Sequence, residues 1–192
     1  TADGRRMRQS PVIDLQAGSY GLRQLGVRAG GEQGDWFYAA SASALKSDGY
    51  REQSEVEKYL FNGKLGYQLD QERSLTVLLN LLDTPEAEDP SGLTREAAEE
   101  DPRQARDIAK TLDSGQTVDQ QLVGTHYRDQ SFGGGALDAT VFYSWRDFEQ
   151  QLPFPGSSLI NYQRDYYGGS VEYSRITDLA GKPLNWVVGT DL

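Results

Sequence analysis

The stretch ALDATVFYSWR, residues 136–146, alternates apolar and polar side chains almost throughout. In an extended chain, Leu137 and Val141 point to one side, while Asp138 and Thr140 point to the other. This period of two is typical of a β-strand that separates an apolar from a polar environment. The stretch decides the fold class because similar alternation recurs along the chain.

The recurring alternation predicts about nine strands, and from the second connection onward short and long connections alternate strictly. The strands are expected at residues 13–17, 25–29, 36–46, 61–67, 75–81, 117–128, 137–146 and 169–176, with a last one from Leu184. The first two are joined at 18–21. Later short turns are expected at 30–35, 70–72, 132–135 and 180–183, and long loops at 47–58, 85–116 and around 152–156. Within the longest loop, Asp101 is predicted to cap a helical turn that begins at Pro102.

Bulk composition restricts the fold class. A hydrophobic content of 37% and a mean hydropathy of −0.64 predict only a thin conventional core. No apolar run approaches the roughly 20 residues of a membrane helix, whereas a barrel strand needs only about 10. Alternating short turns and long loops are typical of up-and-down outer-membrane barrels. We therefore expect an all-β chain, an antiparallel up-and-down transmembrane β-barrel segment with short periplasmic turns and long extracellular loops.

The alternation also predicts which face each side chain occupies. The side chains expected to face outward are Leu137, Val141, Tyr143, Val77 and Leu79, and those expected to face the lumen are Asp138, Thr140, Arg146 and Asn80. Two interfacial aromatic girdles are expected. One has Trp36, Tyr67 and Trp186 beside short turns, and the other has Tyr50, Tyr59, Trp145, Phe148, Tyr166 and Tyr167 near long loops.

Charge and cysteine content exclude several function classes. The chain has no cysteine, which excludes disulfides and cysteine-ligated zinc. A net charge of −10 argues against nucleic acid as a partner. The N-terminus shows no signal peptide, because Arg5, Arg6 and Arg8 precede no apolar segment. Nine strands with one cut short cannot close an outer-membrane barrel of the usual kind, so we expect a fragment of a longer protein.

Catalytic and metal sites are not expected. The acidic residues Glu96, Glu99, Glu100 and Asp101 could bind a cation such as calcium, but a solvated loop face is the more ordinary reading of such a run. His126 is the only histidine, and a transition-metal site needs further ligands. No nucleophile, triad or phosphate loop accompanies any carboxylate pair, so neither an enzyme nor a cofactor is predicted.

A ligand-binding role is predicted for aromatic and arginine side chains at the outer mouth. Such side chains can stack on and pair with an anionic or aromatic ligand. The candidates are Tyr50, Arg51, Arg146, Phe148, Tyr162 and Arg164. The alternative is that the tyrosines belong to the girdles and the arginines contact lipopolysaccharide phosphates.

Several segments resemble the TonB-dependent outer-membrane receptors. At the start, Asp3-Gly4 followed by a strand ending in Gly-Ser-Tyr-Gly at 18–21 resembles the junction between the plug and the barrel of these receptors. Four later runs resemble a subfamily that includes the YncD-type proteins: SDGYREQS at 47–54, SLTVLLNLLDTPEAEDPSGLT at 74–94, DPRQA at 101–105 and VDQQLVG at 118–124.

The resemblance implies a barrel of about 22 strands with a plug in its lumen, located in the outer membrane of a Gram-negative bacterium. Residues 1–8 would end the plug or linker, and residues 9–192 would form part of the barrel. The implied partners are a ferric siderophore or another bulky chelate, outer-membrane lipids and lipopolysaccharide, and the TonB complex through a plug and TonB box that lie outside this sequence. A passive porin and a soluble all-β ligand-binding module are the alternatives, and an outer-membrane enzyme ranks third.

Overall fold

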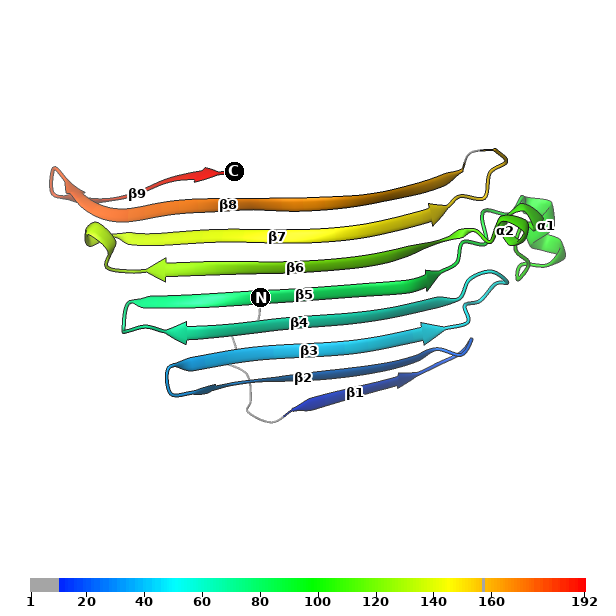
Figure 1. Ribbon diagram of the computed structural model, residues 1–192, viewed down its shortest axis with the longest axis horizontal. Helices are drawn as coiled ribbons and strands as arrows, with labels where there is room; N and C mark the ends of the chain where they lie inside the picture. The colour runs from blue at the N-terminus through cyan, green and yellow to red at the C-terminus, as the bar shows by residue number, and fades with distance from the viewer. Residues whose placement is uncertain (1–10, 157) are drawn as a thin grey trace.

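The protein, seen in a computed structural model that describes residues 11–156 and 158–192, forms one antiparallel sheet of nine strands in sequence order (Figure 1). Each strand pairs with the next along the chain, which makes the sheet a simple meander. The strands are β1 (Val12–Ala17), β2 (Arg23–Gln33), β3 (Trp36–Ser47), β4 (Val56–Gln68), β5 (Arg73–Ala87), β6 (Gly115–Asp129), β7 (Ala136–Gln151), β8 (Leu159–Leu179) and β9 (Lys182–Asp191).

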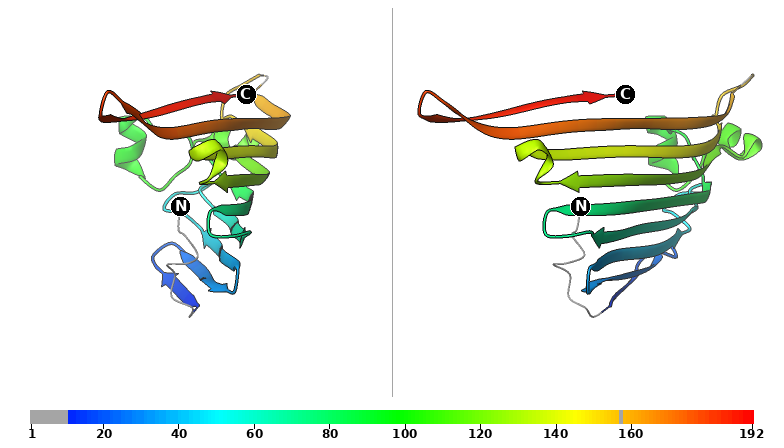
Figure 2. Two further views of the ribbon diagram at one scale, coloured as in Figure 1. Left: turned by 90° about the vertical axis from the view of Figure 1, so that its left-hand side faces the viewer. Right: turned by 60° about the vertical axis from the view of Figure 1, so that its left-hand side comes forward.

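The sheet is a single curved layer, as the end-on view in Figure 2 shows. Among the described residues, only Phe37, Ala105, Ala109 and Val118 are buried apolar side chains. A conventional core therefore contributes little. Hydrogen bonds between neighbouring strands and the register that they fix hold this sheet together.

The register separates the side chains into two faces, as the alternation predicts. Val77 on β5 lies opposite Thr125, which lies opposite Val141 on β7, so the three share one face. On the other face, Asn80 lies opposite Leu122 on β6. Strands β6, β7 and β8 pair without a register shift, so the predicted division into an apolar and a polar set is confirmed.

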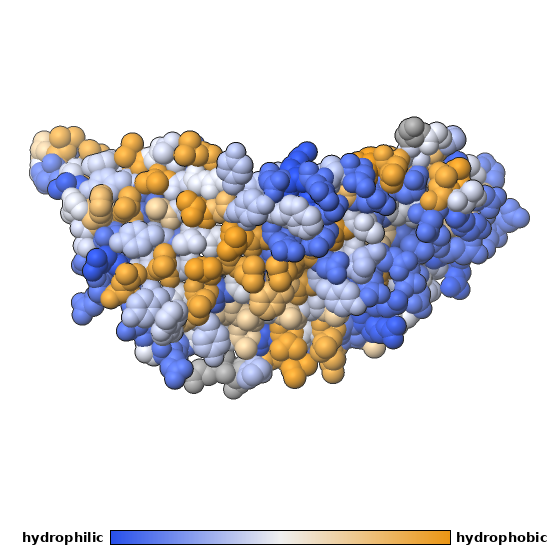
Figure 3. Space-filling model, in the orientation of Figure 1, coloured by the Kyte–Doolittle hydropathy of each residue, from blue (hydrophilic) through white to orange (hydrophobic). Residues whose placement is uncertain are grey.

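The apolar set is exposed on the convex face. Figure 3 shows this face, with apolar patches along the middle of the strands and hydrophilic surface at the loop end. Val141 is 61% exposed there, and Val77, Leu79 and Tyr143 are also exposed. Exposed apolar side chains over so much of a sheet face mark a surface that is suited to an apolar environment.

Long loops and short turns occupy opposite ends of the sheet (Figure 1). The first turn, at 18–22, lies at the same end as the loops 48–55, 88–114 and 152–158, and the remaining short turns lie at the other end. The predicted alternation of connections is therefore confirmed. No helix among the described residues is long and apolar enough to cross a membrane.

Several predicted strand boundaries were wrong. Strand β4 begins at Val56 and β7 continues to Gln151, each five residues beyond the predicted bound toward the loops. Strand β2 continues to Gln33, because Gly30 and Gly31 pair with β3 and the ring of Tyr38 lies over Gly31. Strand β5 continues through Pro85, where a bulge in the β4–β5 register tolerates a residue without an N–H donor. Strand β8 begins at Leu159, ten residues earlier than expected, because polar side chains on both faces hide the period of two there.

The aromatic girdle beside the short turns has the predicted composition. Trp36 packs on Tyr67 with ring centroids 4.7 Å apart, and Trp186 packs on Tyr173 at 5.4 Å. The second girdle was predicted too close to the loops. Trp145, Tyr166 and Tyr167 lie well inside β7 and β8 rather than at their loop ends. Tyr166 and Phe148 moreover lie on the concave face, opposite Ser144 and Tyr162, so neither belongs to an outward-facing girdle.

The longest loop contains two short helices, α1 (Arg95–Glu100) and α2 (Asp107–Leu112). The hydroxyl of Thr94 caps α1 by accepting a hydrogen bond from the backbone N–H of Ala97 at 3.3 Å. Asp101 ends α1 and, as predicted, also caps the turn at Pro102. Its carboxylate accepts a hydrogen bond from the N–H of Arg103 at 2.9 Å, and its carbonyl accepts one from the N–H of Gln104 at 3.4 Å. The turn does not continue as a helix, since α2 begins only at Asp107.

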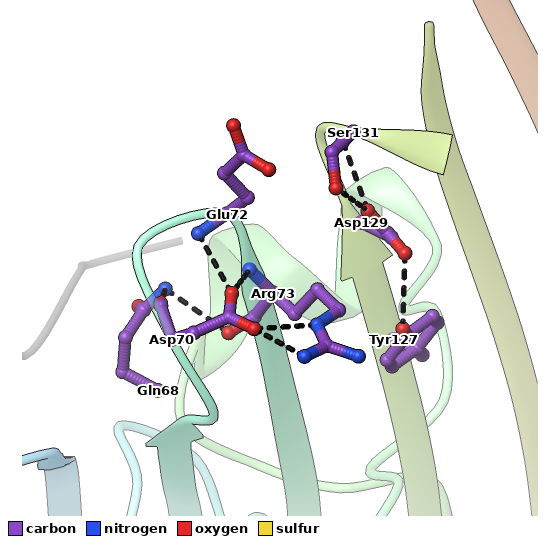
Figure 4. A network of polar contacts seen from close by, with 7 residues as sticks. All are labelled: Gln68, Asp70, Glu72, Arg73, Tyr127, Asp129 and Ser131. Carbon is purple, nitrogen blue, oxygen red and sulfur yellow. Dashed lines mark hydrogen bonds and ion pairs between the residues drawn. The ribbon is translucent and has the colours of Figure 1, made fainter. Parts of the chain in front are cut away.

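Carboxylates close the short turns by capping free backbone N–H groups (Figure 4). Asp70 accepts hydrogen bonds from the N–H groups of Glu72 and Arg73, both at 2.9 Å, and pairs with the Arg73 guanidinium. This ion pair lowers the pKa of Asp70 below its ordinary value. Asp129 caps the N–H of Ser131 at 2.9 Å in the next turn. Asx-type caps of this kind pin the register of these two hairpins.

Gly66 is the position where a single methyl group should be least tolerated. A Cβ atom there would lie 1.9 Å from the Phe37 ring, which lies directly across the β3–β4 pair. Gly66→Ala should therefore lower the unfolding free energy by about 1–3 kcal/mol through overpacking. Gly92→Ala is the control, since nothing lies within 4 Å of its Cβ position. Equal unfolding midpoints in urea for both variants of the full-length protein would contradict this packing.

Candidate functional site

The guanidinium of Arg51 joins two loops at the loop end of the sheet. From the loop 48–55, it donates hydrogen bonds to three carbonyl oxygens of the loop 88–114: Ser91 at 2.6 Å, Gln104 at 2.8 and 3.0 Å, and Pro90 at 3.2 Å. A guanidinium has five N–H donors in a planar fork, enough to satisfy three carbonyls that lie apart. Arg51 therefore holds the longest loop in one conformation and has few donors left for a ligand.

Neighbouring residues reinforce the same junction. Glu52 donates its backbone N–H to the Arg103 carbonyl at 2.8 Å, and its carboxylate accepts from Lys110 of α2 at 3.1 Å. The bond from Lys110, followed by one from the N–H of Ala105, lowers the pKa of Glu52 below its ordinary value. The same pairing raises the pKa of Lys110. The two loops thus form one folded unit.

Tyr50 belongs to an aromatic cluster that brings in the first turn. Its ring packs edge-on against Tyr20 with centroids 5.3 Å apart, and the Arg103 guanidinium lies 5.9 Å from the Tyr50 ring centre and 5.7 Å from that of Tyr20. The Asp48 N–H also donates to the Tyr20 carbonyl at 2.9 Å. Tyr50 is nevertheless 45% exposed, so one side of its ring faces solvent.

The structure places a carboxylate cluster where sequence reasoning did not expect one. Glu55, Glu57 and Glu86 lie close enough for their oxygens to fall within 4.8 Å of one another. Lys46 pairs with Glu55 at 2.5 Å and with Glu57 at 3.2 Å, so its ammonium supplies positive charge to the cluster. The bulge at Pro85 brings β5 into this position, and nothing in the sequence spacing indicates it.

The other four candidates meet on the concave face of β7 and β8. Arg146 lies opposite Arg164, and Phe148 lies opposite Tyr162. The Arg146 guanidinium lies 5.2 Å from the Phe148 ring centre, and Phe148 stacks on Tyr162 at 5.1 Å with the rings tilted by 26°. The Arg164 guanidinium lies 5.1 Å from the Tyr162 ring centre. These contacts join the four side chains into one row, with the two stacked rings in the middle and an arginine at each end.

Tyr166 extends this row and was missed as a ligand-binding candidate. The Arg164 guanidinium lies 5.4 Å from its ring centre and donates a hydrogen bond to its hydroxyl at 2.9 Å. The spacing Tyr162, Arg164, Tyr166 was the available signal, because residues two apart in a strand share a face. We call Arg146, Phe148, Tyr162, Arg164 and Tyr166 the β7–β8 ladder.

A second polar group lies on the concave face nearer the short turns. His126 is within 3.0 Å of the Asp138 carboxylate, and the Arg128 guanidinium lies 3.8 Å from the same oxygen. Asp138 is thus the partner of two basic side chains on β6. The histidine is hydrogen-bonded to a carboxylate, which is the ordinary use of such a residue in a polar sheet face.

The fold of the chain is similar to that of a solved transporter structure. No protein-family model matches the chain. Among solved structures, the ferric citrate transporter FecA in its unliganded form is similar, with a TM-score of 0.73 at 20% sequence identity. The chain has the fold of part of that transporter's barrel. The similarity covers 93% of this chain but only 27% of the FecA chain, so this sequence spans about a quarter of that protein.

Arg51→Lys tests whether one guanidinium joins the loops. A lysine ammonium cannot reach three carbonyls in a fork, so the loop 88–114 should open locally by about 1.5–3 kcal/mol more readily. Hydrogen exchange in the full-length protein should show faster exchange of the Glu52 N–H, which bonds the Arg103 carbonyl. Arg95→Lys is the control, since Arg95 makes only an exposed pair with Glu99. Unchanged exchange in Arg51→Lys would contradict the assignment.

Proposed function

We propose that the chain is part of the barrel of a TonB-dependent outer-membrane receptor, which actively imports a ferric siderophore or a similar bulky chelate. The observation that supports this most is the single curved sheet with an apolar convex face and a polar concave face. Its match to a ferric citrate transporter extends over nearly the whole chain. The YncD-like subfamily is the finer proposal, and it rests on the sequence motifs at 47–54, 74–94, 101–105 and 118–124.

The dimensions of the convex face support a membrane-embedded wall. From Leu137 to Trp145, β7 presents apolar side chains over about 26 Å along the strand. At the tilt of about 35–45° that is usual in outer-membrane barrels, this length spans about 19–22 Å of height, most of their roughly 25 Å apolar band. Next toward the loops, Asp83, Asp119 and Asp147 lie opposite one another on β5, β6 and β7. Three carboxylates at one level mark the point where the face becomes suited to water and headgroups.

The need for active transport follows from the width of the barrel. Nine strands correspond to 27% of the matched transporter chain, so the complete barrel would be wide and its lumen would need a plug. Residues 1–8 would end that plug, and residues 9–192 would belong to the barrel. The Asp3-Gly4 pair of the first segment lies outside the described residues. Moving a plug requires energy, and the resemblance to TonB-dependent receptors implies that TonB delivers it.

Arginine substitutions on the two faces of β7 test the membrane assignment. Val141→Arg should lower the unfolding free energy by about 2–4 kcal/mol if its convex position lies near the bilayer midplane. Thr140→Arg should cost much less, because its side chain points to the concave face. Urea titrations of the full-length protein in lipid vesicles measure both. Equal costs would indicate that neither face meets lipid, as expected for a soluble binding module.

Uptake by whole cells tests the transport mechanism. Accumulation of the cognate iron chelate should collapse in cells that lack TonB, because the plug then stays closed. Surface binding should persist, since the loops and the concave wall remain intact. Uptake that continues without TonB and rises linearly with chelate concentration would identify a passive porin. A matched strain with TonB restored from a plasmid is the control.

A further inference from the structure

Two arginines on the concave face lack a counter-ion. Arg146 and Arg164 lie directly opposite each other on β7 and β8, and like charges in such a position destabilise a sheet. Among the ion pairs of the described residues, none includes either arginine. The Nε of Arg146 is buried and makes no hydrogen bond within the described part of the chain. An anion placed between the two guanidinium groups would offset their like charges, supply the missing counter-ion and offer an acceptor to the Arg146 Nε.

The aromatic rings of the β7–β8 ladder hold these guanidinium groups in place. Phe148 lies beside Arg146, and Tyr162 and Tyr166 lie on either side of Arg164. A ring contact uses the flat face of a guanidinium and leaves its in-plane N–H groups free for oxygen acceptors. The ladder therefore presents oriented donors at little further cost in side-chain entropy.

The neighbouring positions on the concave face are neutral. Gln120 on β6 lies opposite Arg146, Val118 lies opposite Phe148, and Ser144 lies opposite Tyr166. Arg128 on the same face differs, because it has Asp138 within 3.8 Å. The charge at the ladder is thus left for a group from outside the described part of the chain.

We propose that the β7–β8 ladder binds the oxyanion groups of an anionic iron chelate, carboxylates above all, with Arg146 and Arg164 as the charged contacts. This inference rests on the proposed transport function and names its substrate class. The Phe148–Tyr162 stack offers the apolar surface beside those contacts. Recognition is short-range, because a chain of net charge −10 does not attract anions over a distance. Tyr50 and Arg51 act separately, by fixing the loops above.

The test measures the binding of defined probes to the purified full-length protein. The probes are iron(III) citrate, an anionic iron(III) tris-catecholate, an uncharged iron(III) tris-hydroxamate, and citrate without iron. Wild type should bind at least one anionic chelate more tightly than the uncharged one. Arg146→Gln and Arg164→Gln should each weaken that binding about tenfold or more. If iron-free citrate bound as tightly as iron(III) citrate, the ladder would recognise the free anion rather than its iron chelate.

Stability measurements separate this role from a structural one. Removing either ladder arginine should leave the unfolding midpoint unchanged or raise it, because two like charges no longer oppose each other. Arg128→Gln is the matched control on the same face, and it should lower stability by leaving Asp138 with His126 as its remaining basic partner while sparing affinity.

Three outcomes would overturn the proposal. These are wild-type protein that binds neither anionic chelate, a preference for the uncharged chelate, and affinities that are the same in Arg146→Gln, Arg164→Gln and Arg128→Gln. None of them bears on whether uptake requires TonB. Conversely, cells could take up the chelate without TonB while the ladder still binds the anionic chelate. That result would reject the proposed transport mechanism but support the proposed binding site.

Discussion

Pairing of backbone groups across one layer is the constraint on which this structure depends. No second layer packs on either face of the sheet within the described residues, so the strands are held by their hydrogen bonds to one another. The same register decides which side chains face which environment. A slip of one residue would carry Asp138 to the convex face and Val141 to the concave face. The side-chain caps at Asp70 and Asp129 matter because they fix hairpin register where each pair of strands begins.

The backbone groups of the loops have no neighbouring strand, so their hydrogen-bond partners must come from elsewhere. In the loop 88–114, part of this need is met by one side chain from another loop, Arg51. Ser114, fully buried at the end of the loop, donates its hydroxyl to the Asp89 carbonyl at 2.7 Å and closes the loop onto its own start. These contacts hold the long loop in one conformation. Around Leu152 and Ser158 the hydrogen bonds are local: the Leu152 N–H donates to the Ser158 carbonyl, and the Gln151 amide donates to the Ser158 hydroxyl at 2.7 Å.

Sequence patterns predicted the strands well where one face is apolar and the other polar. Strand β7 and the stretch Leu75–Leu81 of β5 have this contrast, and their faces came out as expected. The contrast disappears toward the loops. Residues 159–168 of β8 carry polar groups on both faces, and the strand was not recognised there. The period of two says nothing about loops either, so the partners of Arg51 and the meeting of Glu55, Glu57 and Glu86 could not be foreseen.

The candidate site was partly predictable because its residues lie in strands. Arg146, Phe148, Tyr162 and Arg164 have the parity that places them on one face, and the register then brings the two strands together. What the sequence did not reveal is the register itself, which decides that the arginines oppose each other rather than a carboxylate. Tyr50 and Arg51 have the same composition as the ladder but occupy a loop. Composition alone therefore grouped residues that the fold separates.

The separation of charge between the faces follows from the strand geometry. Each ladder arginine is followed directly by an aspartate, Asp147 after Arg146 and Asp165 after Arg164. In a strand, adjacent side chains point to opposite faces, so neither aspartate can neutralise its neighbour. On the convex face, the two carboxylates accept hydrogen bonds from Gln163 and Tyr143. The concave face keeps the positive charge. Two Arg-Asp pairs that are neutral in composition thus give one wall of the lumen a cationic patch, and a helix of the same sequence would not.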